Sequence, residues 1–350
     1  MKTLKPIALL LALVLALGML TACAPTVVVL QEEALVSEDD GIQPVTEGSV
    51  KTGLSFVTST MASTSATEEE DGIAQSDISL VAVTVDENGV IDRCVIDSVQ
   101  AKIGFDAKGT LTGDVNAPIL SKNELGTDYG MSVISPIGKE WNEQVAALAS
   151  YVVGMTVEEV TGIKINAEGK PQDADLAASV TIYMGGLLAG IEDAVNNAVH
   201  LGAQKGDELV LHTLTSAAGS KDAVADTDGL AQAYCTVAVM TLNGDVITGC
   251  YLDAVQANVG FDENGALTTE LSDDVPSKNT QGDEYGMSAI SSIGADWHEQ
   301  AASFSAYVTG KTVAEAAGIA VSEGKAADAD LASSVTMSIG DFLTLMEKAG

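Results

Sequence analysis

The sequence has few basic residues. Among its 350 residues, 16 are lysine or arginine and 50 are aspartate or glutamate, which gives a formal net charge of −34. A chain of this charge repels phosphate backbones, so nucleic-acid binding is excluded. Histidine is also scarce, because only three are present and no two have the spacing of metal ligands. A zinc site built from histidines and a multi-haem carrier are therefore excluded, and no metal site is expected.

Several catalytic signatures are missing as well. The chain has no glycine-rich phosphate loop with the usual fingerprint, no serine nucleophile elbow and no Cys-x-x-Cys pair. Without a nucleophile–base pair, a hydrolase has no support, and we expect an electron carrier at most rather than an enzyme. The apolar content of 46% is nevertheless too high for a disordered acidic chain, so a folded protein is expected.

The N-terminus has the features of a bacterial lipoprotein signal. Two lysines precede an unbroken apolar run over residues 7–17, which is too short for a stable membrane span. The segment Leu-Thr-Ala-Cys that ends at Cys23 resembles a lipobox, in which the cysteine is lipidated and becomes the first mature residue. We therefore expect a signal peptide over 1–22, an acidic tether over 23–50 and an extracytoplasmic protein held to membrane lipid through Cys23.

The strongest internal signal is a long repeat. Residues 121–144 and 277–300 are identical at 15 of 24 positions, and the match extends in both directions with a period of about 156 residues. A period of this length indicates two whole domains rather than a solenoid. We place repeat domain one at 51–200 and repeat domain two at 207–350. The short polar segment between them leaves the relative placement of the two domains open.

Each copy is predicted to begin with strands and to continue with helices. A β-prone run is followed by a hairpin whose turn is Asn88-Gly89 in one copy and Asn243-Gly244 in the other. A helix with a periodic apolar face then begins near each tryptophan, and a second helix follows a capping box. This order predicts an α+β fold of two homologous tandem domains, each a mostly antiparallel sheet with C-terminal helices.

Three cysteines remain besides Cys23. A two-residue turn at 243–244 would place Cys250 opposite Val237, with Cys235 as a diagonal neighbour that is too distant for good disulfide geometry. We expect Cys94, Cys235 and Cys250 to be small buried hydrophobic residues, with a redox pair as the alternative.

A compact motif precedes the last helix of each copy. It is Asp-Leu-Ala-Ala-Ser-Val-Thr over 175–181 and Asp-Leu-Ala-Ser-Ser-Val-Thr over 330–336. This motif resembles that of the FMN-binding domain family, in which an Asp, two residues, a Ser, a small residue, an Ala and a Thr precede a helix. The resemblance covers most of both repeats, through the β-rich start, the tryptophan helix, the motif and the closing helix. The family includes duplicated lipoproteins that carry electrons outside the cytoplasmic membrane.

The resemblance implies that a flavin transferase joins the phosphate of FMN to Thr336 and to Thr181. Supporting positions are Asp175, Asp330, Ser333, Ser334 and Ser338. Valine replaces the family's alanine at positions 180 and 335, and Ala178 replaces the motif serine in copy one, so Thr336 is the better candidate. We expect Ser338 to cap the closing helix of copy two and to leave a helix N-terminus for the phosphate, whereas copy one has Tyr183 at that position. Ordinary helix capping is the alternative explanation of the motif.

The repeated Tyr-Gly-Met stretch is the other candidate site. Tyr129 and Met131, like Tyr285 and Met287, lie in a glycine-rich loop just before the tryptophan helix. Together with the tryptophan they are a possible platform for an isoalloxazine ring. The alternative is that the glycines shape a turn and the large side chains belong to the core.

These observations lead to one expected function and one alternative. The expected function is a membrane-anchored extracytoplasmic lipoprotein that carries covalent FMN and transfers electrons from a membrane electron donor. The alternative is a non-flavin cell-envelope lipoprotein that binds a small molecule or a protein partner through its repeated domains.

Overall fold

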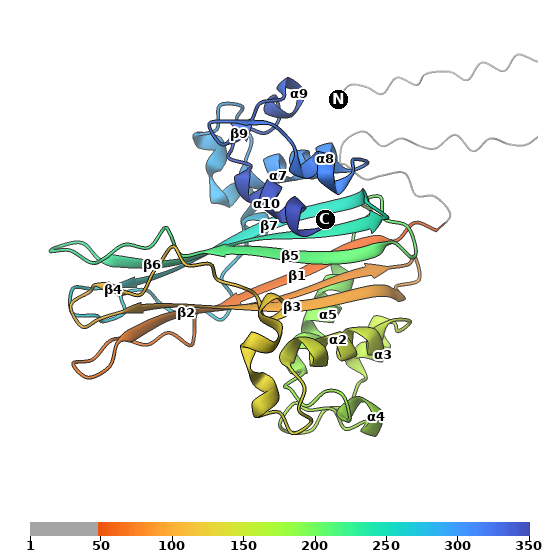
Figure 1. Cartoon of the computed structure of the whole chain (residues 1–350), viewed down its shortest axis with the longest axis horizontal. Helices are drawn as coiled ribbons and strands as arrows, with labels where there is room; N and C mark the ends of the chain where they lie inside the picture. The colour runs from red at the N-terminus through yellow and green to blue at the C-terminus, as the bar shows by residue number, and fades with distance from the viewer. Residues whose placement is uncertain (1–47) are drawn as a thin grey trace, which may run out of the picture. The chain divides into compact units, whose positions relative to one another are not determined.

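The computed structural model describes residues 48–350, which all belong to one compact unit. The predicted signal peptide, Cys23 and most of the tether lie outside the described residues. The fold is α+β and contains two similar repeated units, each an antiparallel sheet followed by helices, as predicted (Figure 1). No described helix has the length and hydropathy needed to cross a bilayer.

Each repeat is built on three long antiparallel strands. The strands of repeat one are β1 (Lys51–Ser59), β2 (Gly72–Val85) and β3 (Ile91–Phe105), with the short β4 (Leu111–Thr112) at the edge. Those of repeat two are β5 (Glu208–Ser216), β6 (Gly229–Asn243) and β7 (Val246–Phe261). A separate small hairpin joins β8 (Val321–Ser322) to β9 (Lys325–Ala326). The two predicted hairpins are confirmed as β2–β3 and β6–β7, but the turn of the second is Gly244-Asp245, because Asn243 is the last residue of β6 and pairs with Val246.

The helices follow the strands in the same order in both repeats. Repeat one has α1 (Lys122–Leu125), η1 (Gly126–Tyr129), η2 (Met131–Val133), α2 (Trp141–Val152), α3 (Val157–Thr161), α4 (Ala174–Ala177) and α5 (Gly185–Asn196). Repeat two has α6 (Lys278–Gln281), η3 (Gly282–Tyr285), η4 (Met287–Ala289), α7 (Trp297–Val308), α8 (Val313–Ala317), α9 (Ala329–Ala332) and α10 (Gly340–Lys348). The predicted capping boxes at Thr156 and Thr312 are confirmed.

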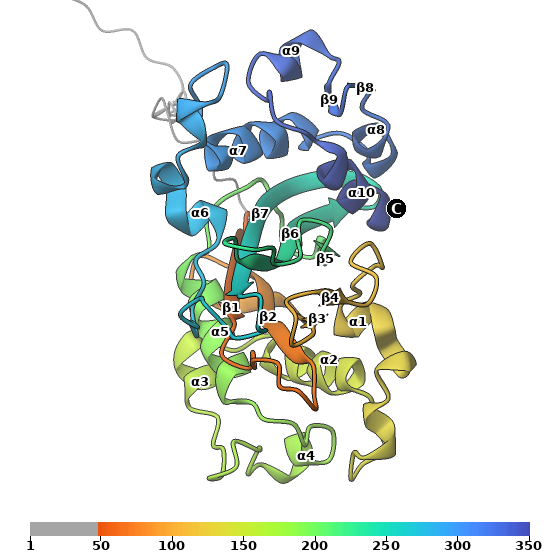
Figure 2. The same cartoon turned by 90° about the vertical axis from the view of Figure 1, so that its left-hand side faces the viewer.

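The two sheets pack face to face, and helices cover their outer faces (Figure 2). Successive side chains of a strand point to opposite faces, so β2 contributes to two cores. Ile78, Leu80 and Ala82 pack against the sheet of repeat two, whereas Val81 and Val83 pack against helices of repeat one. The sequence did not determine how the two repeats are placed. Burial of both faces of β2 shows that the sheet of repeat one packs against that of repeat two.

Beyond the helices, the two sheets continue as a sandwich lined by small residues. Four buried alanines of this end lie in β6, β7 and the segment after β5, and two lie in β2 and β3. Small side chains allow the strands of the two repeats to approach closely. Reciprocal backbone hydrogen bonds connect the copies here, from Ala66 N to Gly265 O and from Ala223 N to Gly109 O, both at 2.8 Å.

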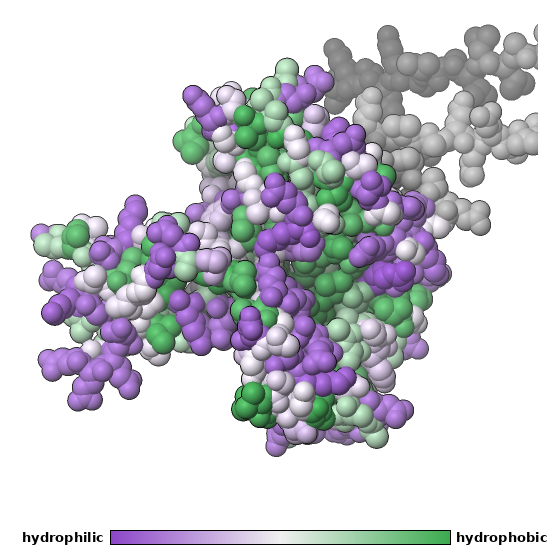
Figure 3. All heavy atoms as spheres, viewed as in Figure 1, coloured by the Kyte–Doolittle hydropathy of each residue, from purple (hydrophilic) through white to green (hydrophobic). Residues whose placement is uncertain are grey.

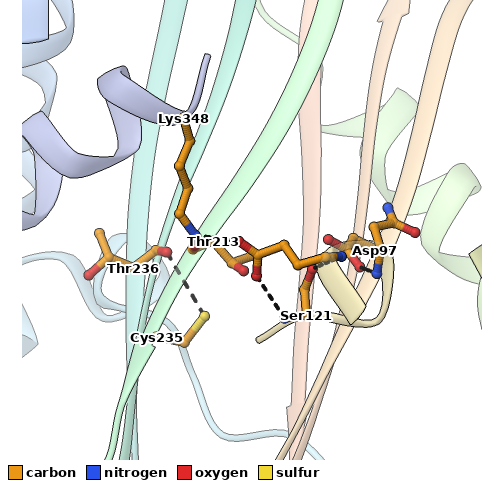
Figure 4. A network of polar contacts seen from close by, with 8 residues as sticks. Asp97, Ser121, Thr213, Cys235, Thr236 and Lys348 are labelled. Carbon is orange, nitrogen blue, oxygen red and sulfur yellow. Dashed lines mark hydrogen bonds and ion pairs between the residues drawn. The ribbon is translucent and has the colours of Figure 1, made fainter. Parts of the chain in front are cut away.

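The repeats also meet at the C-terminus. The Nζ atom of Lys348, at the end of α10, donates to the backbone oxygen of Thr213 at 2.6 Å and pairs with Glu124 of α1 (Figure 4). At the other end of the described chain, Val50 is buried and its N–H donates to Ala203 O at 3.0 Å. The last residues of the predicted tether therefore take part in the folded unit.

Candidate functional site

The motif threonine of repeat two lies between α9 and α10. Thr336 is half-buried, and the Oε1 atom of Gln300 accepts hydrogen bonds from its backbone N–H at 2.8 Å and from its hydroxyl at 3.4 Å. Gln300 belongs to α7 and is fully buried. Its Nε2 donates to Ser291 Oγ and Ala295 O, both at 3.1 Å, which fixes the amide so that Oε1 faces the threonine.

Repeat one has the same arrangement. Gln144 is fully buried in α2 and accepts from the backbone N–H of Thr181 at 2.8 Å and from its hydroxyl at 3.1 Å. Sequence reasoning missed these two glutamines. The signal was present, because Gln144 and Gln300 are the final identical pair of the matched segments.

The other motif positions have mostly local roles. The Ser333 hydroxyl donates to Asp330 O at 2.7 Å, and that of Ser334 donates to Leu331 O at 3.3 Å. Asp175 and Asp330 are exposed, and the neighbouring residues Asp173 and Asp328 are the ones that cap α4 and α9. Val180 and Val335 are fully buried, so valine at these positions fills the cores beneath the motif. The structure therefore groups Thr336 with Gln300 rather than with the motif acids.

The prediction that Ser338 caps the closing helix is wrong. The N-cap residue of α10 is Ile339, and no side chain caps this helix. Ser338 is exposed, and the Ile339 N–H donates to Gly324 O at 3.0 Å. The equivalent helix α5 also begins without a capping side chain, at Met184. Both motif threonines thus precede helices whose first N–H groups lack a side-chain acceptor.

The two helix starts differ in what covers them. In repeat one a Cβ atom on Gly169 or on Gly185 would clash with the Tyr183 side chain, so this ring lies against the start of α5. In repeat two a Cβ atom on Gly340 would lie 4.0 Å from the small side chain of Ser338. The start of α10 is therefore the more open of the two.

The repeated Tyr-Gly-Met loop surrounds a lysine. In repeat two, Lys278 Nζ lies 4.6 Å from the ring centroids of Tyr234 and Tyr285 and 5.0 Å from that of Trp297. We call these four residues the lysine–aromatic cluster. In repeat one, Lys122 lies 5.0 Å from the centroid of Tyr129 and 4.9 Å from that of Trp141. The predicted aromatic platform thus has a cation over its tryptophan face in both copies.

Met131 and Met287 are half-buried and pack against the cores of their own repeats. The backbone N–H of Met131 also donates to the Glu140 carboxylate at 2.8 Å, which ties the loop to the start of α2. The alternative that these methionines belong to the core therefore explains their contacts. Figure 3 shows other hydrophobic residues at the surface of both helical layers, and the most exposed in the loops are Val133, Ile134 and Ile290.

Electrostatics distinguish the lysine of repeat two. Lys278 is 4% exposed and donates to the Tyr234 hydroxyl at 2.9 Å, while burial lowers its pKa to about 8. Asp253 lies nearby in β7, and burial raises its pKa to about 6 although Ser277 donates to it at 2.7 Å. In repeat one Asp77 occupies the position of Tyr234. Three aromatic rings therefore surround the lysine of repeat two, whereas two surround that of repeat one.

The buried carboxylates position this loop. Asp253 accepts from Asn279 N at 3.1 Å, and Asn279 Nδ2 donates to Leu252 O at 2.8 Å. In repeat one the Asp97 carboxylate lies beside Ser121 (Figure 4) and accepts from Asn123 N at 3.1 Å. The repeated Ser-Lys-Asn sequence thus serves to join the helical loop to the third strand.

The cysteines are free in the described chain. Cys235 and Cys250 are buried and Cys94 is partly buried, and burial raises the thiol pKa of each to about 12. The predicted partner of Cys250 is wrong. The hairpin turn lies at Gly244-Asp245 and a register shift follows at Thr241/Leu242, and together they place Cys250 opposite Met240. The described residues contain no cluster of His, Cys, Asp and Glu suited to a metal ion.

Comparison of the chain with protein-family models, with curated proteins and with solved structures found no match.

Proposed function

We propose that this protein is an extracytoplasmic lipoprotein that carries FMN covalently on Thr336 and transfers electrons. The proposal rests on the resemblance of the motif at 330–336 to that of the FMN-binding domain family. One structural observation supports it above the others. The motif threonine precedes an uncapped helix in each repeat, although capping is the rule elsewhere in the described chain.

The contrast in capping is sharp. Eight of the ten described α-helices begin at a residue whose side chain caps them or forms a capping box, and the two exceptions are α5 and α10. Free N–H groups and the positive end of the helix dipole stabilise a phosphate near a helix N-terminus. A phosphoester on Thr336 would be attached four residues before Gly340, the first residue of α10.

Repeat two is the better carrier on steric grounds. The Tyr183 ring lies against the start of α5, whereas Ser338 leaves the start of α10 open. A bulky phosphoester therefore meets less obstruction at Thr336 than at Thr181.

The threonine needs a modifying enzyme. A hydroxyl that donates to an amide oxygen, as Thr336 does to Gln300, is oriented but is not activated, because an amide is not a base. A flavin transferase would supply the base that takes the hydroxyl proton. In this transfer the bond from Thr336 Oγ1 to the FMN phosphorus would form, the pyrophosphate bond of FAD would break, and AMP would leave.

The bound flavin would supply the redox chemistry, and the protein would supply attachment, location and surroundings. The lysine–aromatic cluster packs into the same core of repeat two as Val335, the residue before Thr336. Lipid on Cys23 would hold the chain at the membrane beside its electron donor. Thr181 is the secondary candidate for attachment, because the Tyr183 ring lies against the start of α5.

The test is the intact mass of the mature chain after production beside an active flavin transferase. We expect a mass gain of one FMN phosphoester that Thr336→Ala abolishes and that Thr181→Ala leaves in place. A gain of two would add Thr181 as a site. An unmodified mass, with the transferase shown to be active on another substrate, would overturn the proposal and favour a non-flavin lipoprotein that binds its partner through the repeats.

A further inference from the structure

The most exposed large apolar side chains of the described chain lie in one loop of each repeat. Ile290 is 87% exposed in repeat two, and Val133 and Ile134 are 88% and 82% exposed in repeat one. Ile293 follows Ile290 in the same loop and is 40% exposed. We call residues 288–294 the isoleucine loop. An isoleucine held in water forgoes the free energy that burial of its side chain gives, so a partner that covers this loop gains affinity.

Hydrogen bonds hold the isoleucine loop in one conformation. The backbone N–H groups of Ile290 and Ser291 both donate to Met287 O, at 3.0 and 2.9 Å. The N–H of Ser288 donates at 3.0 Å to the carboxylate of Asp296, which is buried at the start of α7. The fold therefore presents the exposed isoleucines on a preorganised surface, which reduces the entropy lost when a partner binds.

The isoleucine loop lies beside the motif threonine. One amide joins the two, because Gln300 Nε2 donates to Ser291 Oγ at 3.1 Å and Gln300 Oε1 accepts from Thr336 N at 2.8 Å. Ile290 immediately precedes Ser291, and Ile293 follows it by two residues. An enzyme that acts on the Thr336 hydroxyl therefore also covers at least part of this loop.

The motif contributes few contacts of its own to such an enzyme. Val335, the residue before Thr336, is fully buried. The hydroxyls of Ser333 and Ser334 donate to backbone oxygens three residues earlier in the chain. Recognition of the folded chain therefore needs a surface beyond the motif, and the isoleucine loop is the exposed apolar surface next to it.

The charges around the two loops differ between the repeats. The segment 282–300 has four acidic residues and no Lys or Arg, whereas the equivalent segment 126–144 has three acidic residues and Lys139. FAD would bring a negatively charged pyrophosphate to this acidic surface, so its counter-charge has to come from the enzyme. A partner with basic side chains around an apolar pocket therefore fits repeat two better than repeat one, in agreement with the choice of Thr336.

We propose that the isoleucine loop is the docking surface of the flavin transferase. Ile290 and Ile293 enter an apolar pocket of the enzyme, and basic side chains of the enzyme face the acidic residues around the loop. Apolar anchors surrounded by a polar rim are the usual arrangement of a protein–protein interface. This docking rests on the proposed function, because it requires that Thr336 be modified.

The test is the initial rate at which Thr336 gains FMN in the whole mature chain, followed by intact mass with FAD and a purified flavin transferase. Every chain carries Thr181→Ala, so that a single site is measured. Ile290→Ser with Ile293→Ser should lower kcat/KM about tenfold, mainly through a higher KM for the chain. The rate for the parent should also fall as ionic strength rises, because the rim contacts are between charges.

Two further variants serve as controls. Ile290→Leu with Ile293→Leu keeps the loop apolar and should retain the rate of the parent. Val133→Ser with Ile134→Ser makes the matched change in repeat one and should leave the loading of Thr336 unchanged. Hydrogen exchange of the Thr336 amide, compared with the parent, shows whether the serine variant of repeat two keeps the motif in place.

The possible failures are distinguishable. A parent chain that stays unmodified, with the transferase active on another substrate, would overturn the proposed function and the docking surface with it. A parent that is loaded and a serine variant that is loaded at the same rate would overturn the docking surface alone. Equal rates with stronger quenching of the bound flavin by iodide would assign the loop to the isoalloxazine ring instead. A slower rate with faster exchange of the Thr336 amide would trace the loss to a distorted motif and also overturn the docking surface.

Discussion

The rings of Phe105 and Phe261 stack on each other with their centroids 4.3 Å apart and their planes 6° from parallel. These two residues occupy the same position in the two repeats, at the ends of β3 and β7. Contact between equivalent residues is the mark of a two-fold symmetric interface, in which each copy presents the same surface to the other. The two repeats therefore pack like the subunits of a homodimer that are joined in one chain.

This stack makes Phe261 a test of whether the repeats unfold together. Both phenylalanines are fully buried, so Phe261→Ala should lower the free energy of unfolding by about 3–5 kcal/mol. The surface variant Ile290→Ala, whose side chain is 87% exposed, should change it by less than about 0.5 kcal/mol. Urea unfolding measures both. Variants that retain only Trp141 or only Trp297 report on each repeat by fluorescence, and we expect coincident transitions. Two separate transitions would show that the interface does not couple them.

Asp253 should make stability depend on pH in mild acid. Its pKa is raised from 3.8 to about 6 in the folded state, chiefly by burial. The folded protein therefore binds more protons than the unfolded chain between these values, and the contribution of Asp253 to stability falls as pH rises through this window. Asp253→Asn should remove this part of the slope in urea titrations between pH 4 and 6. An unchanged slope would refute the assignment to this carboxyl.

Lys278 should have an effect in the alkaline range. Burial lowers its pKa from 10.5 to about 8, so the unfolded chain binds more protons than the folded protein between these values. The free energy of unfolding should therefore rise as pH increases from about 8 towards 10. Lys278→Met should abolish this rise and extend the acid slope of Asp253 to higher pH, because the charge of Lys278 lowers the pKa of that carboxyl. Guanidinium unfolding across pH 7–10 provides the measurement, and a rise that persists in the variant would contradict the prediction.

Gln300 should hold the motif segment in place. Gln300→Leu leaves the N–H groups of Thr336 and Met337 without their acceptor and should cost about 1–3 kcal/mol. It should also speed hydrogen exchange of the Thr336 amide. Gln144→Leu is the matched change and should speed exchange at Thr181 and not at Thr336. Equal effects of both variants at both threonines would indicate general destabilisation instead.

Substituting Tyr for Ser338 and Ser for Tyr183 tests the steric difference between the starts of the two closing helices. In the presence of the flavin transferase, Ser338→Tyr should reduce FMN loading of Thr336 several-fold, because the ring would cover the start of α10 as Tyr183 covers that of α5. Tyr183→Ser should increase loading of Thr181. Peptide mass spectrometry assigns the modified threonine. Loading that does not respond to either change would show that access to the helix start is not what selects the site.

The sequence alone determined the local structure and the duplication. The two hairpins, the capping boxes at Thr156 and Thr312 and the order of strands before helices depend on neighbouring residues, so each could be predicted from a short segment. The match between 121–144 and 277–300 likewise required only comparison of the chain with itself. These features gave the α+β fold and its two copies.

Tertiary structure decided everything that depends on residues distant in the chain. The run 80–85 was predicted only as a strand of a hairpin, and the structure shows that this strand is buried on both faces, one of which meets the other repeat. The contact of Gln300 with Thr336 and the cation over Trp297 each join segments that no local pattern connects. Cys250 faces Met240 rather than its predicted partner because both the turn and the bulge of the β6–β7 hairpin differ from the simple Asn243-Gly244 turn that the sequence predicted. Local propensity acts over a few residues, whereas contacts between faces depend on how whole sheets and helices bury their apolar sides.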